Sequence, residues 1–476
     1  MMDTYATARS MLADLAAKKV SARELLDAHL ARNEKIAPAI NAVIATDIAR
    51  ARKDAAAIDA ARARGEALGP LAGLPMTIKD GFDVQNMPAT AGAPQFKDRA
   101  KDCADATVVA AARGAGAVIW GKTNVPFMLS DIQSYNVING TTNNPYDVTK
   151  VPGGSSGGAA AALATGVTPL EIGSDIGGSL RHPANFCGVT SLKPTWGALS
   201  GRGHVPPAPE AYFECDIGVY GPMARNAGDL KLLWSVLHGS PQQSHRDVKG
   251  ARVAVWDEEA SWPLARDVRD GVRRAADALA ASGAQVERAK PAIDGATLME
   301  VYTTILTPIV ALDMPEAMMK AFETMRESDR ALMEAGGEGA AIAAFRLRAT
   351  STFREIAAAW VARQRFKDIL AEFFARYDVI LMPITMVPPF AHLQEGSFAD
   401  RVLEVDGTAV PYNNLLDWIA PASALHAPAL AVQAGRTAQG LPVGVQIVGP
   451  WHGEDRLFDF AATIEDQLGG FTPPPL

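Results

Sequence analysis

The sequence predicts an α/β fold in which helices cover a large sheet. Two observations support this prediction: helical and strand-like segments alternate between residues 105 and 120, and they alternate again between residues 251 and 287. Such alternation is typical of parallel strands whose connecting helices cover the sheet. The composition agrees with a large hydrophobic core, because 48% of the 476 residues are apolar and 21% are charged.

The N-terminal part of the chain leads to a buried lysine. Ser21-Ala22-Arg23-Glu24 is a capping-box pattern and predicts the start of a helix. Residues 40–45 read as a short strand, and residues 47–64 as a charged, alanine-rich helix. Residues 74–78 then form an apolar strand, which carries Lys79 to its carboxyl end.

A second helix and strand precede a long polar segment. The pattern predicts a helix over residues 105–113, a strand over 117–120 and a turn over 121–124. Residues 125–146 form an irregular segment rich in Asn, Ser and Thr. In α/β proteins, loops of this kind border the active site.

The stretch from Pro152 to Thr195 organises the rest of the chain. It contains two glycine-flanked serine sites, GGSSGG at residues 153–158 and DIGGS at residues 175–179, and a short alanine-rich helix between them, residues 159–165. Glycines beside hydroxyls let the backbone approach a ligand with its N–H groups free. The amides of residues 176–179 would converge near the Ser179 oxygen, as expected for a nucleophile beside an oxyanion hole.

This stretch resembles the signature of the amidase signature family of serine hydrolases. The resemblance implies a Ser–Ser–Lys triad with Ser179 as nucleophile and Ser155, preceded by a cis peptide bond, as the bridging serine. It implies Lys79 as the base, because residues 73–80 fit the G-x-P-x-x-x-K-D context. Leu180 and Ser191 depart from the commoner residues of the family, but neither is a triad position.

The resemblance covers residues 20–468 and also implies an architecture and a substrate pocket. We expect a single domain over residues 1–476 with a large, mostly parallel, twisted mixed sheet covered on both faces by helices. The expected substrate-binding and oxyanion residues are Ile176, Gly177, Gly178, Leu129 and Ser130.

The second half of the chain continues the α/β pattern around a helical segment. It predicts strands over residues 217–223, 251–256, 285–287 and 377–383, with helices over 227–237 and 267–281, and two final strands within 424–449. Residues 297–365 instead form methionine-rich helical runs, which we expect to be an insertion that caps the substrate entrance. A methionine lining would accept bulky apolar substrates, although methionines of this kind more often fill a core.

Composition excludes several other classes of protein. The net charge of −8 has no basic cluster, so we expect neither nucleic acid nor an anionic membrane as a direct partner. Cys103, Cys187 and Cys215 are too few and unevenly spaced for a disulfide framework or a zinc site, and the eight histidines lack metal-ligand spacing. No signal-peptide pattern and no transmembrane run is present. We expect a cytoplasmic protein with neither metal nor cofactor.

These observations predict a serine amidohydrolase that acts on a small-molecule carboxamide, anilide, carbamate or ester through an acyl-enzyme on Ser179. The alternative is the amidase (glutaminase) subunit of a tRNA-dependent amidotransferase, which passes ammonia to a partner. A Ser–His–Asp site that joins His426 or His452 to Ser155 is a weaker alternative, because nothing around either histidine supports it. The sequence leaves open whether the chain is a homodimer.

Overall fold

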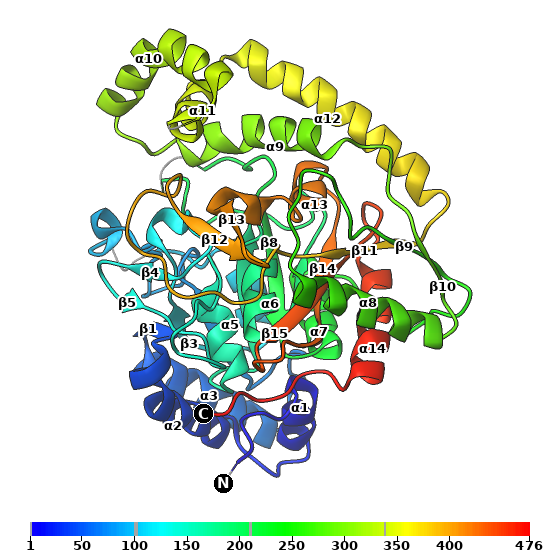
Figure 1. Cartoon of the computed structure of the whole chain (residues 1–476). Coiled ribbons are helices and arrows are strands. Elements are labelled where there is room, and N and C mark those ends of the chain that lie inside the picture. Colours follow the sequence, from blue (N-terminus) through cyan, green and yellow to red (C-terminus); the bar gives the residue numbers. More distant parts are fainter. Residues whose placement is uncertain (1, 100–102, 209–211, 338) are drawn as a thin grey trace.

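The computed structural model describes residues 2–99, 103–208, 212–337 and 339–476. Within these residues a central sheet has the strand order β10-β9-β11-β15-β14-β7-β8-β6 (Figure 1). Its strands are β6 (Leu170–Asp175), β7 (Thr190–Lys193), β8 (Val219–Ala224), β9 (Arg252–Val255), β10 (Gln285–Arg288), β11 (Val379–Pro383), β14 (Ala429–Arg436) and β15 (Pro442–Val448). The sheet confirms the predicted α/β class.

The prediction that this sheet is mostly parallel was wrong. β9 pairs in parallel with β10 and with β11, whereas the other neighbouring strands of the described sheet run antiparallel. The expected β-α-β unit does supply the parallel pairing of β9 and β10, through helix α8 (Arg266–Ala281). β14 and β15 follow each other after a short loop, and two strands joined in this way pair antiparallel.

Lys79 lies in a separate, smaller sheet. This sheet has the order β1-β3-β2 and consists of β1 (Val43–Thr46), β3 (Val118–Thr123) and β2 (Pro75–Lys79). The turn expected over residues 121–124 was wrong, because Gly121, Lys122 and Thr123 continue the β3 ladder. A lysine can remain in this strand because its amine is paired: Lys122 Nζ lies 3.2 Å from the buried Asp80 carboxylate and donates to the Phe82 carbonyl at 2.6 Å.

Helices cover both faces of the central sheet. Arg181 of α6 (Arg181–Cys187) donates to the Gln446 side chain of β15 at 2.9 Å, whereas Gly271 of α8 lies against Val443 of the same strand. Because successive side chains of a strand point to opposite faces, α6 and α8 lie on opposite sides of β15. All seven residues of β15 are accordingly buried.

The other helices and hairpins surround this arrangement. The helices are α1 (Ala8–Ala16), α2 (Ala22–Ile40), α3 (Ile48–Ala63), α4 (Thr107–Gly114), α5 (Gly157–Ala164), α7 (Ala227–His238), α13 (Ala420–Ala424) and α14 (Glu454–Leu468). The hairpins are β4 (Tyr135–Asn136) with β5 (Gly140–Thr141) and β12 (Val402–Val405) with β13 (Thr408–Pro411). The capping box predicted at Ser21 and Glu24 is confirmed at the start of α2.

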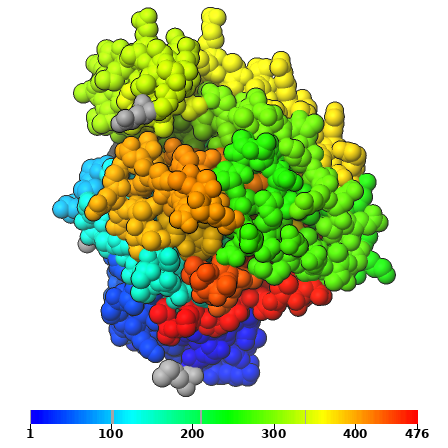
Figure 2. Space-filling model, viewed as in Figure 1, coloured from blue at the N-terminus to red at the C-terminus, as the bar shows by residue number. Residues whose placement is uncertain are grey.

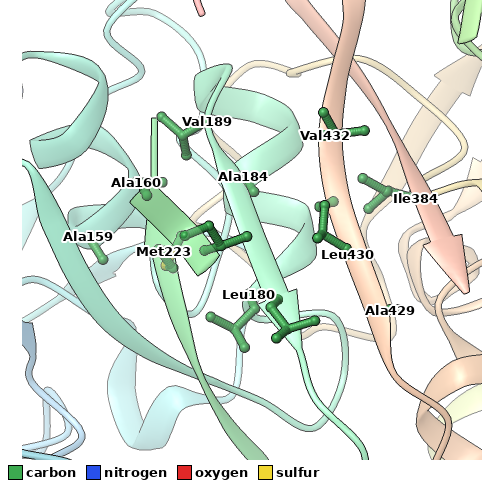
Figure 3. Packing of buried hydrophobic residues seen from close by; sticks show 14 of the residues in the cluster. Ala159, Ala160, Leu180, Ala184, Val189, Met223, Ile384, Ala429, Leu430 and Val432 are labelled. Carbon is green, nitrogen blue, oxygen red and sulfur yellow. The ribbon is translucent and has the colours of Figure 1, made fainter. Parts of the chain in front are cut away.

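Buried apolar side chains join the signature stretch to the central sheet. Leu180 and Ala184 belong to the same cluster of buried apolar side chains as Leu430 and Val432 of β14, and all four are fully buried (Figure 3). The segment that carries the glycine-flanked serines is therefore part of the core, which limits its motion.

The chain between β10 and β11 is helical, as predicted. The helices are α9 (Gly295–Val310), α10 (Glu316–Ala335), α11 (Ala340–Ala349) and α12 (Phe353–Phe374). They lie together at one end of the molecule, where α10 and α11 protrude (Figures 1 and 2). We refer to α9–α12 as the helical segment.

Candidate active site

Lys79 reaches a serine of the GGSSGG motif from the end of β2. The whole strand is buried, and Lys79 Nζ lies 2.8 Å from Ser155 Oγ. The same amine lies 2.9 Å from Ser174 Oγ and 3.3 Å from the Ser174 carbonyl oxygen. The lysine and the bridging serine that the sequence singled out are thus in direct contact.

The GGSSGG backbone brings Ser155 close to Ser179. The peptide bond between Gly154 and Ser155 is cis, as the resemblance implied. A glycine is needed at position 154, because the backbone packs so closely on the neighbouring segment that a Cβ atom there would clash with the Gln133 carbonyl oxygen. The backbone N–H of Ser156 then donates to the Ser179 carbonyl at 3.3 Å.

The loop from Asp175 to Ser179 is held by an aspartate–arginine pair. Arg181 donates to both carboxylate oxygens of Asp175, at 3.0 and 3.1 Å. Asp175 also accepts the N–H of Gly178 at 2.9 Å, so this amide is not free to bind a substrate oxyanion, contrary to the expectation for Gly178. Burial would raise the pKa of Asp175, but the charge and N–H groups of Arg181 hold it well below its usual range.

The protein environment lowers the pKa of the lysine into the neutral range. Burial lowers the pKa of Lys79 to about 7, although the negative charges of Asp175 and Glu171 oppose the change. Burial also raises the pKa of Glu171 to about 7, against the hydrogen bond that it accepts from Thr77 at 2.7 Å. A large fraction of Lys79 is therefore an uncharged amine at physiological pH.

The two serines open into one cavity. Ser155 and Ser179 line it together with Leu129, Ser130 and Ile176. Gly177 and Gly178 are not among its lining residues. Much of the remaining wall is apolar: Met128, Phe213, Val219, Tyr220, Ile309, Val310 and Leu312. Among the described residues that line the cavity there is no lysine or arginine.

The helical segment contributes to the cavity through the end of α9 and not through its methionines. Within the described residues, the methionines of residues 299–333 are absent from the cavity wall. Met318, Met325 and Met333 of α10 are instead exposed at the surface. The helical segment therefore supplies no methionine lining to the described cavity wall, because these three side chains of α10 face solvent.

The sequence patterns did not indicate three residues that neighbour the triad in the structure. Ser174 directly precedes the DIGGS motif, and this position is the feature of the sequence that could have indicated it. His204 lies 2.9 Å from Ser174 Oγ through Nε2, and Tyr302 of α9 donates its hydroxyl to the Ile176 carbonyl at 2.8 Å. Nothing local in the sequence marks His204 or Tyr302, because both reach the site only through the tertiary fold.

The weaker alternative finds no support in the site, because neither His426 nor His452 is among the residues that line the cavity. His426 Nε2 lies 2.8 Å from Asp216 Oδ1 and 3.2 Å from Arg363 of α12, while Ser155 contacts Lys79. His452 donates its backbone N–H to Thr195.

In the described part of the chain, no group of three or more His, Cys, Asp or Glu residues is placed to hold a metal ion. Among the described helices, none is long and apolar enough to cross a membrane.

Comparisons with known proteins agree over nearly the whole chain. A family model described as Amidase matches residues 24–458. A glutamyl-tRNA(Gln) amidotransferase subunit from Prochlorococcus marinus is 33% identical over 485 residues, which cover 96% of each chain. The subunit of the same name from Acidothermus cellulolyticus is 32% identical over 496 residues, which cover 96% of this chain and 94% of the relative.

Solved structures share the fold. The 6-aminohexanoate cyclic dimer hydrolase complexed with substrate superposes with a TM-score of 0.80 at 26% identity, over 100% of this chain and 99% of that one. A bacterial aryl acylamidase of the amidase signature family superposes with the same TM-score of 0.80 at 24% identity, over 97% of this chain and 96% of that one. The second likeness shows the fold alone.

Proposed function

The chain belongs to the amidase family and is an amidase, a hydrolase of C–N bonds, and we propose that it works through an acyl-enzyme on Ser179 with Ser155 and Lys79 as its proton relay. The observation that carries the proposal is the 2.8 Å contact between Ser155 Oγ and a buried lysine amine whose pKa burial lowers to about 7. An uncharged amine can accept a proton, whereas an ordinary lysine cannot do so at neutral pH.

The reaction begins with proton removal from the nucleophile. Ser179 Oγ gives its proton to Ser155 Oγ, whose own proton passes to Lys79 Nζ. The Ser179 oxygen then forms a bond to the substrate carbonyl carbon, and the carbonyl electrons move to its oxygen. As the C–N bond breaks, the relay runs in reverse and gives the proton to the leaving amine. Water attacks the acyl-enzyme by the same relay and releases the acid.

The developing oxyanion needs N–H donors beside Ser179. The amides of Ile176, Gly177 and Ser179 are our candidates, because the Gly178 amide already donates to Asp175. The Tyr302 hydroxyl and the Asp175–Arg181 pair hold this loop on both sides, which favours donors that are fixed before the substrate arrives.

The mainly apolar wall of the cavity favours substrates with an apolar acyl group. Leu129, Ile176 and the apolar end of α9 would contact it, and carboxamides, anilides, carbamates and esters all present a carbonyl that Ser179 could attack. We propose that Ser130 lines the entrance on the side of residues 125–146, and that the helical segment acts as a cap because the end of α9 forms part of the cavity wall.

A second candidate function is the amidase subunit of a tRNA-dependent amidotransferase. The relatives that match nearly the whole chain are named as amidotransferase subunits, and they favour this candidate over a free-standing amidase. The cavity chemistry favours the first candidate, because a glutamine substrate carries a carboxylate and the described cavity wall has no lysine or arginine to pair with it.

A single preparation separates the two candidates. The purified chain is assayed with hexanoyl p-nitroanilide and with L-glutamine, and the protein is examined by intact-mass spectrometry after rapid acid quenching. We expect nitroaniline release and a hexanoyl adduct that is absent from Ser179→Ala. If glutamine were the only substrate hydrolysed, and if its hydrolysis required added partner proteins, the result would instead support the amidotransferase role.

A further inference from the structure

We propose that His204 is a positioning residue that acts through Ser174 to fix the direction of proton transfer between Ser155 and Lys79. The inference rests on the proposed function. Neither His204 nor Ser174 belongs to the triad that the sequence indicates, yet both line the cavity beside it.

The hydrogen bonds of His204 determine its tautomer. Its Nδ1 lies 2.9 Å from the Pro206 carbonyl oxygen, which can only accept a hydrogen bond. Nδ1 therefore carries the proton of a neutral ring, and Nε2 is an acceptor. Burial, reinforced by the nearby charge of Lys79, lowers the pKa of His204 to about 3, so the ring is neutral at working pH. Edge contacts with Phe82 and the proximity of Tyr220 hold the ring in place.

The histidine then determines how the Ser174 hydroxyl is oriented. Nε2 lies 2.9 Å from Ser174 Oγ, and an acceptor nitrogen requires the hydroxyl proton to point at it. The lone pairs of Ser174 Oγ consequently face the other way, toward the Lys79 amine at 2.9 Å. Ser174 is thus an acceptor for Lys79.

Counting the hydrogens on Lys79 gives the direction of the relay. A neutral amine has two N–H groups and one lone pair. One N–H goes to the Ser174 carbonyl at 3.3 Å and the other to Ser174 Oγ, since both oxygens only accept from the amine. The lone pair is left for the third neighbour, Ser155 Oγ at 2.8 Å, which must donate its proton to the lysine. Once protonated, the amine has three N–H groups for the same three oxygens.

Without the histidine acceptor, a second arrangement competes. The Ser174 hydroxyl could then turn its proton to the lone pair of Lys79, which would leave Ser155 as an acceptor of an N–H and stop the transfer. A hydrogen bond to the neutral amine would also favour the neutral form. Loss of the acceptor therefore lowers both the rate and the pKa of the base.

The experiment compares His204→Leu, which removes the acceptor, with His204→Gln, whose side-chain oxygen can replace Nε2. We expect kcat for hexanoyl p-nitroanilide to fall about tenfold to a hundredfold in His204→Leu, and the acidic limb of kcat/KM to move about 0.5 to 1 unit toward lower pH. His204→Gln should restore most of both. The other titratable and charged groups around the relay are Glu171, Asp175 and the Lys122–Asp80 pair, and they are unchanged in both variants.

A double-mutant cycle tests whether the effect passes through Ser174. In a Ser174→Ala background, His204→Leu should have little further effect on kcat. Three outcomes overturn the inference: a limb that stays in place or moves to higher pH, as water entry around Lys79 would cause; a His204→Gln variant no better than His204→Leu; or fully additive losses. Activity that survives Ser179→Ala and Lys79→Ala would instead overturn the proposed function, so the two failures are distinguishable.

Discussion

Lys79 illustrates how burial converts an ordinary side chain into a base. Its usual pKa near 10.5 falls to about 7, because the buried site cannot solvate the ammonium form as water does. A change of one pKa unit corresponds to about 1.4 kcal/mol, so the shift reflects several kcal/mol of lost solvation that Asp175 and Glu171 only partly offset.

The role of Ser179 makes the first prediction at this scale. Ser179→Ala should lower kcat by up to about a millionfold, as the loss of a serine nucleophile does elsewhere. Ser282→Ala is a control, because Ser282 lies at the end of α8, its hydroxyl donates to the Ala278 carbonyl, and it is absent from the cavity wall. Initial rates of nitroaniline release measure both. If Ser179→Ala kept more than a tenth of the wild-type rate, another nucleophile would be needed.

The protonation of Lys79 makes the second prediction. Because the base must be neutral, kcat/KM should be low at pH 5, rise through about pH 7 and level off above pH 8. Lys79→Ala should lower the rate near neutral pH by about 10²- to 10⁴-fold, and it should abolish this acidic limb, the rise of kcat/KM through about pH 7. Rates measured from pH 5 to 10 test the profile.

Glu171 provides the control for this profile, since burial raises its pKa to about 7 as well. Glu171→Gln removes a negative charge that favours the ammonium form of Lys79, so the limb should persist and shift to lower pH. Disappearance of the limb in Glu171→Gln, with its retention in Lys79→Ala, would assign the titration to the carboxylic acid.

At the scale of elements, α9 connects the helical segment to the catalytic loop. Tyr302 is fully buried in α9, and its hydroxyl donates to the Ile176 carbonyl at 2.8 Å. Ile176 begins the turn that carries Ser179, so the position of α9 and the orientation of the proposed oxyanion amides are linked. The last turn of α9 also forms part of the cavity wall.

This link makes the third prediction. Tyr302→Phe removes one hydrogen bond worth about 1 kcal/mol and should lower kcat about fivefold, with a smaller change in KM. Tyr377→Phe removes a comparable bond, from a half-buried tyrosine outside the cavity wall to Glu287 at 2.7 Å, and should leave kcat unchanged. Equal effects of the two substitutions on kcat and on thermal stability would mean that α9 only contributes to folding.

At the scale of the whole molecule, the cavity lies where distant segments meet. Four parts of the chain contribute to its wall: residues 128–130, the signature stretch, residues 204–207 with 213–220, and the end of α9. Its mainly apolar character therefore arises from four separate parts of the chain, and this character determines which acyl groups fit.

The apolar wall makes the fourth prediction, which concerns acyl length. Burial of one methylene contributes about 0.8 kcal/mol, so each added carbon should raise kcat/KM up to roughly fourfold until the cavity is full. A series of p-nitroanilides from acetyl to octanoyl, followed by nitroaniline absorbance, measures this trend. Glutaryl p-nitroanilide is the matched control, because its terminal carboxylate would lie against a wall without lysine or arginine among the described residues. A flat or falling series would show that the acyl group lies elsewhere.

The sequence alone determined the local structure and the chemistry of the signature. Residues that are close in the chain carry the capping box of α2, the alternation of β9, α8 and β10, and the glycines that bring Ser155 and Ser179 together, and such patterns depend on short-range sterics and hydrogen bonding. The assignment of Lys79 to the site also required the resemblance to the amidase signature family, because 76 residues separate Lys79 from Ser155.

Only the tertiary structure decided the strand directions, the cavity wall and the surroundings of the lysine. The sheet is mainly antiparallel in its described pairings because β14 and β15 form a hairpin beside β7, and this neighbour relation joins residues that lie more than two hundred positions apart. The exposed methionines of α10 and the His204–Ser174 contact likewise depend on how distant elements pack. Which side chain faces which depends on packing between distant elements, and no local pattern encodes it.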